Sequence, residues 1–140
     1  MKNLLIIFLT VIFFLSSCKP EFQTIDYGHE SCVHCKMTII DNRFAAEILT
    51  KKGKAYKFDD VECVLNYVRE EKIGQADVLV FVSNFSTPNS KFLNANEAIY
   101  IHNISFNTPM NGNLAAFPKE MARKLTDSFK QVPIGWKDLK

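Results

Sequence analysis

The residues with the clearest chemical potential lie in one short stretch, Cys32-Val-His-Cys-Lys-Met37. It places four potential metal ligands within six residues: Cys32, His34, Cys35 and Met37. If the chain is extended from Cys35 to Met37, the thiolate and the thioether point to the same face. Soft sulfur ligands favour Cu(I). Zinc more often takes a second pair of cysteine or histidine ligands at a characteristic spacing, and the sequence has no obvious second pair.

Each of these residues also has a simpler interpretation, and residue types alone leave the alternatives open. Cys32 and Cys35 can form a structural disulfide in an oxidising compartment. They can also form a thioredoxin-like redox pair, although that motif belongs at a helix start within a βαβ unit, and here a β-branched run follows. Met37 can be core filling, and His34 can be a surface residue.

The N-terminus is typical of a cleavable bacterial lipoprotein signal. Lys2 gives a positive start, residues 4–15 are almost uninterruptedly apolar, and Leu-Ser-Ser-Cys18 follows. The apolar stretch is shorter than the ~20 residues that span a bilayer. The last four residues resemble the lipobox, which implies that Cys18 is lipidated and becomes the new N-terminus. Lipidated lipobox cysteines carry three acyl chains, and stable anchoring needs at least two.

Lipidation of Cys18 has two consequences for the rest of the chain. It predicts that the protein is anchored on the periplasmic side of either the inner or the outer bacterial membrane. It also leaves an odd number of cysteines, so at least one thiol is expected to be free for chemistry or metal binding. The three that remain are Cys32, Cys35 and Cys63.

Composition and patterning predict one small α+β domain after the signal. We assign residues 1–17 to the signal peptide, 18–30 to a lipid-anchored tether and 31–140 to the domain. The formal net charge is only +2, and no basic run is present, so nucleic acid is not expected as a partner. Apolar patterning predicts strands at 44–50, 54–58, 77–83, 98–101 and 114–117 and helices at 59–74 and 118–130, with a mostly antiparallel sheet.

Three blocks, in this order behind a lipobox, resemble NosL, a family of copper-binding accessory lipoproteins of nitrous oxide reductase. The first is Cys-x-x-Cys-x-Met-x-Ile at 32–39, the second is Phe-Asp-Asp-Val-Glu-Cys at 58–63, and the third, at 109–117, begins with Pro-Met. The resemblance implies an α+β fold of ββαβ-type units, related in shape to the organomercurial lyase core.

The resemblance also implies roles for single residues. Cys35 and Met37 correspond to the sulfur ligands expected for Cu(I), Met110 to a methionine that the third block brings to the site, and His34 to an extra nitrogen donor. Cys32 completes the set of candidate ligands. The chain departs from the family where Lys36 replaces a frequent glycine.

Two features of the second block have simple structural interpretations. Cys63, in the first turn of an amphipathic helix, is expected to be a buried small hydrophobe. Asp59 and Asp60 invite a catalytic interpretation as paired carboxylates, but a helix N-cap explains them more simply.

These inferences predict a membrane-anchored Cu(I) metallochaperone that is not an enzyme. The family resemblance implies that the acceptor is nitrous oxide reductase and that an ABC-type membrane assembly complex is a docking partner. Two alternatives remain at this stage. One is a membrane-tethered thiol-disulfide oxidoreductase that uses Cys32 and Cys35, and the other is a copper scavenger or sensor unrelated to nitrous oxide.

Overall fold

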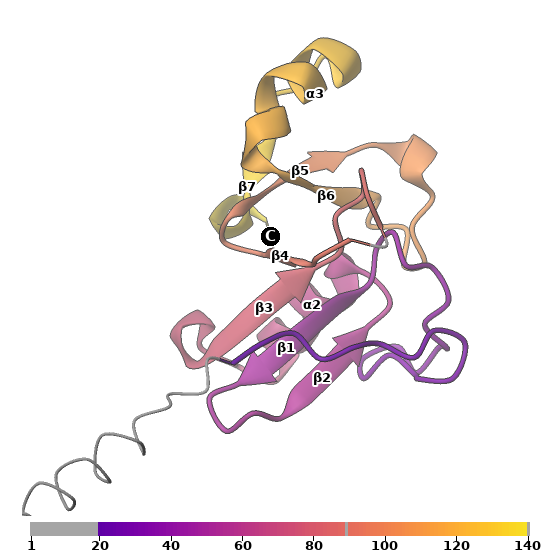
Figure 1. The fold of residues 1–140 in the computed structure, drawn as a ribbon, viewed down its shortest axis with the longest axis vertical. Coiled ribbons are helices and arrows are strands. Elements are labelled where there is room, and N and C mark those ends of the chain that lie inside the picture. Colours follow the sequence, from indigo (N-terminus) through magenta and orange to yellow (C-terminus); the bar gives the residue numbers. More distant parts are fainter. Residues whose placement is uncertain (1–19, 89, 140) are drawn as a thin grey trace, which may run out of the picture.

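The computed structural model describes residues 20–88 and 90–139, which form two antiparallel sheets and two α-helices (Figure 1). The α+β class predicted from the sequence is confirmed. The signal peptide at 1–17 and the lipidation site Cys18 lie outside the described residues. Within those residues, no helix is both long and apolar enough to cross a membrane.

The first sheet has the strand order β2-β1-β3-β4. The hairpin of β1 (Ala46–Thr50) and β2 (Ala55–Phe58) forms as expected, and β1 also pairs antiparallel with β3 (Val78–Val82). β4 (Leu93–Asn94) is a two-residue edge strand inside the segment that the sequence indicates as polar and turn-rich.

The second sheet has the order β6-β5-β7. β5 (Ala98–His102) is central between β6 (Leu114–Pro118) and β7 (Ile134–Gly135). Helix α3 (Ala122–Phe129) follows β6 through a 3-10 turn, Lys119–Met121. The expected helix start at Pro118 is wrong because Pro118 is the last residue of β6, paired with Ala98. The remaining 3-10 turns are Gln75–Asp77, Ile104–Phe106 and Trp136–Asp138.

Helix α2 (Val61–Glu70) covers one face of the first sheet. It ends at Glu70, before the predicted end at Gly74. Lys72 adopts the left-handed conformation that closes the helix (φ 53°), and Ile73 donates its amide proton to the carbonyl of Val68 over 3.0 Å. Gly74 instead precedes the 3-10 turn at Gln75–Asp77.

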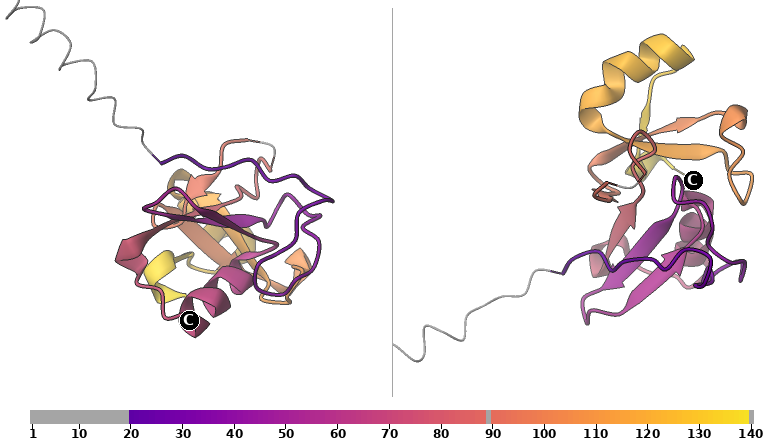
Figure 2. Two further views of the ribbon diagram at one scale, coloured as in Figure 1. Left: turned by 90° about the horizontal axis from the view of Figure 1, so that it is seen from below. Right: turned by 45° about the vertical axis from the view of Figure 1, so that its right-hand side comes forward.

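The segment at 20–27 covers the opposite face of the first sheet, as Figure 2 shows. Ile25 is buried, and the backbone amide of Gln23 donates to both carboxylate oxygens of Glu47 on β1, over 3.1 and 3.2 Å. Coverage on both faces explains why four consecutive residues of β1 are buried. The described part of the expected tether at 18–30 is therefore packed on the domain rather than running free of it.

Two apolar clusters hold the layers together. The larger one joins both sheets and α2, and it includes the side chains of Cys32 and Cys63. The smaller one fixes α3 and the second sheet. Its buried members are Phe44, Ile101, Phe106, Ala115, Phe117 and Leu125.

Candidate metal site

A tight hairpin carries the two cysteines of the Cys-x-x-Cys stretch. The amide of Cys32 donates to the carbonyl of Met37 over 2.8 Å, and the amide of Lys36 donates to the carbonyl of Cys32 over 3.0 Å. Lys36 has φ 68°, in the left-handed region that favours glycine. The chain is therefore not extended from Cys35 to Met37, and that assumption of the sequence analysis is wrong.

A backbone hydrogen bond links this hairpin to the end of β2. The amide of Val33 donates to the carbonyl of Lys57 over 2.9 Å. From Lys57 the chain passes through Phe58, Asp59 and Asp60 directly into α2. The hairpin thus lies against the N-terminus of α2, about thirty residues later in the sequence.

Asp60 is the residue that fixes the start of α2. Its backbone is extended (φ −153°, ψ 175°), and its Oδ1 accepts the amide proton of Cys63 over 2.9 Å. Its Oδ2 accepts the amide proton of Met110 over 2.8 Å, so the loop before β6 is tied to the same point. Burial raises the pKa of this carboxyl above its ordinary value. Because Asp60 is the cap, Asp59 is available for another role.

Four donor groups converge at this junction. The Sγ atoms of Cys32, Cys35 and Cys63 and a carboxylate oxygen of Asp59 all lie within 4.8 Å of one another. A tetrahedral site with Zn–S bonds of about 2.3 Å separates its sulfurs by about 3.8 Å, so the cluster needs only small movements to enclose an ion. Cys32, Cys63 and Asp59 are buried, whereas Cys35 is half-buried.

The carboxylate of Asp59 is incompletely satisfied in the described residues. Its Oδ2 accepts a hydrogen bond from Cys35 Sγ over 3.2 Å, but its buried Oδ1 has no hydrogen-bond partner there. Between residues 20 and 139, position 89 apart, no ion pair involves this side chain. A buried carboxylate without a partner is costly, and a bound cation removes that cost.

The three thiols differ in their readiness to ionise. A hydrogen bond from Cys63 is the main reason why the pKa of Cys32 falls to about 6, and the backbone amides of Cys35 and Asp59 add to it. Burial raises the pKa of Cys35 to about 12. The pKa of Cys63 is also raised, first because its thiol donates to Cys32 and then because it is buried. One thiolate and two thiols therefore share the metal-free cluster near neutral pH.

The other residues predicted to bind metal, His34, Met37 and Met110, are not among these four donors. His34 pairs through Nε2 with Glu70 at 3.2 Å, and its buried Nδ1 has no partner within the described part of the chain. Met37 follows the hairpin and is 45% exposed. Met110 is half-buried, and its side chain packs against the core that contains Cys32 and Cys63.

Cys63 and Asp59 are the two donors that the sequence analysis assigned to other roles. Cys63 is buried, as expected of a small hydrophobe, but its thiol faces Cys32. The signal that points to it is its position three residues after a capping aspartate, in the first turn of a helix. The partial positive charge of the helix N-terminus favours the thiolate form that a metal ion requires, although in the metal-free cluster the bond to Cys32 and burial raise the pKa of Cys63.

The fold and this cluster define a small α+β domain with a thiol-rich site of the kind that holds a soft metal ion. The NosL family model matches residues 24–130, and the chain belongs to the NosL family. NosL is a non-enzymatic family, so the chain is not an enzyme, and the oxidoreductase alternative is set aside. No curated protein gave a significant match to the sequence.

A solved structure supports the fold independently. The chain is similar to the crystal structure of the copper chaperone NosL from Shewanella denitrificans, with a TM-score of 0.68 and 21% sequence identity. The match covers 88% of this chain and 98% of the other. The comparison therefore shows the same architecture at low sequence identity.

Proposed function

We propose that this protein is a metallochaperone that binds Cu(I) at the cluster of Cys32, Cys35, Cys63 and Asp59 and hands it to an acceptor. The observation that carries the proposal is the convergence of three thiols on a buried carboxylate oxygen that has no hydrogen-bond partner in the described residues. The name of the structural relative, a copper chaperone, supports copper as the cargo.

The donor set favours Cu(I) over harder ions. Three sulfurs dominate the cluster, and thiolates and thioethers are the ligands that Cu(I) prefers. The exposure of the donors is graded: Cys32 and Cys63 are buried, Cys35 is half-buried, and Met37 is 45% exposed. This gradient suits transfer by ligand exchange, in which an incoming acceptor reaches the outer donors first. In this scheme Met37 is an outer donor, and Met110 and His34 are neighbouring groups available to complete the coordination.

An anaerobic Cu(I) titration against a competing chelator tests the site. We expect one tightly bound ion, with binding lost in Cys32→Ser and Cys35→Ser. In contrast to the expectation from sequence, Cys63→Ala is also expected to weaken binding, because its thiol lies inside the cluster. Met37→Leu is expected to speed the loss of copper to the chelator more than it lowers the affinity.

A matched methionine supplies the control. Met121 lies in the turn before α3, where its sulfur accepts a hydrogen bond from Ser86 Oγ over 3.0 Å. Met121→Leu should leave both affinity and release unchanged. Copper binding no tighter than that of a generic thiol would overturn the proposal, and so would full binding in Cys35→Ser. Tighter binding of Zn²⁺ than of Cu(I) under the same conditions would reassign the cargo.

The cellular part of the proposal rests on the lipobox and on the family. We propose that Cys18 is lipidated, that the domain faces the periplasm, and that nitrous oxide reductase receives the copper with an ABC-type membrane assembly complex as docking partner. Deletion of the gene should leave the reductase without the absorption spectrum of its copper-sulfide centre, and the wild-type gene but not Cys35→Ser should restore it. A fully loaded reductase in the deletion strain would instead favour a scavenger or sensor.

A further inference from the structure

An apolar pocket of about 740 Å³ lies on the face of the first sheet opposite α2. The segment 20–27 forms one side, and Phe81, Pro88 and residues 90–92 form the other. None of the four residues of the metal cluster lines it. Its volume falls within the range of about 300–1,000 Å³ that is usual for small-molecule pockets. The proposed metal binding does not use this pocket.

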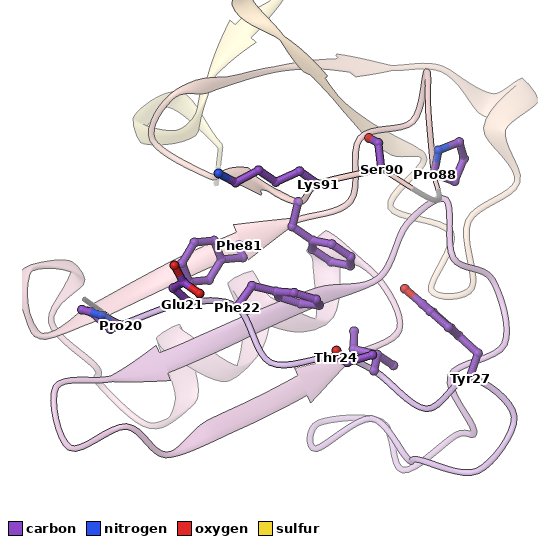
Figure 3. A pocket seen from close by; sticks show the side chains of 11 residues that line it. Pro20, Glu21, Phe22, Thr24, Tyr27, Phe81, Pro88, Ser90 and Lys91 are labelled. Carbon is purple, nitrogen blue, oxygen red and sulfur yellow. The ribbon is translucent and has the colours of Figure 1, made fainter. Parts of the chain in front are cut away.

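The walls of the pocket are aromatic. Phe22 stacks on Phe92 with ring centroids 3.8 Å apart and meets the edge of Phe81 at 6.2 Å. The two charged side chains, Glu21 and Lys91, lie at one end, whereas Thr24, Tyr27 and Ser90 line the rest of the pocket with hydroxyl groups. Figure 3 shows the ammonium group of Lys91 on the same side as Pro20 and Glu21, whereas Tyr27 lies at the other end. The pocket thus has one charged end and a largely aromatic remainder.

The wall formed by the N-terminal segment is held in place by polar contacts to the sheet. Gln23 is bonded to the buried carboxylate of Glu47, and Lys57 Nζ donates to the carbonyl of Thr24 over 2.6 Å. Ile25 is only 3% exposed. The segment therefore has contacts of its own, and the pocket does not depend on a ligand to form.

The charged end of the pocket is the end nearest to Cys18 along the chain. Pro20 lines this end, and Cys18 precedes it by two residues, a reach of at most about 7 Å. A lipid attached to Cys18 is therefore within reach of this end, where Lys91 and Glu21 offer polar partners to its glyceryl and ester groups. An acyl chain that continues along the pocket meets the rings of Phe22, Phe81 and Phe92, and the hydroxyl groups beside them are few.

We propose that this pocket binds one fatty acyl chain of the lipid carried by Cys18. The proposal rests on the lipidation of Cys18 that is part of the proposed function. Two acyl chains are enough for stable anchoring, so one of three can leave the bilayer without releasing the protein. The bound chain fixes the first sheet close to the membrane surface and gives the domain one orientation there.

Photo-crosslinking in the lipidated protein tests the proposal. The protein is produced in cells fed a photoreactive fatty acid, purified with its lipid, reconstituted into phospholipid vesicles and irradiated. We expect intramolecular crosslinks from the lipid of Cys18 to peptides that contain Phe22, Phe81 or Phe92. Crosslinks to bilayer phospholipid alone would overturn the proposal and leave the anchoring intact. An intact mass without acyl groups would overturn the anchoring, and this proposal with it.

A second measurement uses the unlipidated Cys18→Ser protein and a fluorescent fatty acid. One-to-one binding is expected, and Phe22→Glu should weaken it by at least about tenfold, because it puts a charge in the apolar wall. Phe129→Glu, a half-buried aromatic residue on α3, is the matched control and should leave binding unchanged. Cu(I) binding should be the same in all of these proteins, which separates a failure of the pocket from a failure of the metal site. Equal affinity in Phe22→Glu and the control would overturn the proposal.

Discussion

The hydrogen bond from Cys63 to Cys32 makes a prediction about the metal-free, fully reduced protein. This bond is the largest cause of the lowered pKa of Cys32, so Cys63→Ala should return that pKa from about 6 toward its ordinary value of 9.0. Cys35→Ala should move it less, because the backbone amide of residue 35, which also bonds to the Cys32 thiolate, is still present.

The expected effect on stability follows from the size of the shift in the pKa of Cys32. A fall from 9.0 to about 6 is about three pH units, which corresponds to about 4 kcal/mol of preference for the thiolate in the folded state. Because the folded pKa is the lower one, this stabilisation is complete above the unfolded pKa and is lost as the pH falls through about 6. The free energy of unfolding should therefore rise between pH 6 and 9 more steeply in the wild type than in Cys32→Ser.

Two measurements check this reasoning. The ultraviolet absorbance of thiolate, followed against pH, should show a first midpoint near 6 in the wild type and a clearly higher one in Cys63→Ala. Urea unfolding at several pH values gives the difference in slope between the wild type and Cys32→Ser. Groups that do not interact with Cys32 cancel in that difference, whereas Cys35 and Cys63, whose pKa values Cys32 raises, do not. The explanation is refuted if the first midpoint lies above about pH 8 or does not move in Cys63→Ala.

Three further predictions concern the backbone around the site, and each is measured by urea unfolding of the metal-free protein. Asp60→Ala removes the acceptor of two amide protons and should lower the free energy of unfolding by about 2–4 kcal/mol. Asp60→Ser keeps the helix cap, so its loss should be about 1 kcal/mol smaller; equal losses would contradict the capping role. Lys36→Gly should leave the stability unchanged or raise it by up to about 1 kcal/mol, because glycine adopts the left-handed conformation without steric strain. Lys36→Ile should destabilise the protein, and the reverse order of the two variants would show that the hairpin adopts another conformation. Gly112→Ala places a Cβ atom 2.8 Å from Cβ of Glu62 and should cost about 1–3 kcal/mol; an unchanged midpoint would mean that the loop before β6 shifts freely.

Local patterns in the sequence predict the first hairpin and α2 well. The turn at 51–53 between two strand-like segments and the apolar spacing from Val61 to Val68 are strong signals that act within a few residues. The elements that escape prediction depend on distant partners. β7 has only two residues, and it exists because Ile134 and Gly135 pair with β5. Its pairing partner, not its own composition, determines its structure.

The candidate site shows the same difference between residues that local patterns identify and residues that only the folded chain brings together. The spacing of Cys32 and Cys35 marks them directly, since both lie on one short hairpin. Cys63 and Asp59 join them only because Val33 bonds to Lys57 and brings the hairpin to the start of α2. Nothing local to Cys63 specifies that contact, so its convergence with the hairpin could be read only from the folded chain.

The two halves of the metal cluster belong to different segments, and this has a mechanical consequence. The hairpin with Cys32 and Cys35 and the helix with Cys63 are joined along the chain only through β1, β2 and their turns. An ion shared between them acts as a removable cross-link, and its binding energy becomes resistance to unfolding. Loading should make this end of the domain rigid, and release should loosen it. The melting temperature of the domain is then a direct readout of whether an ion is bound.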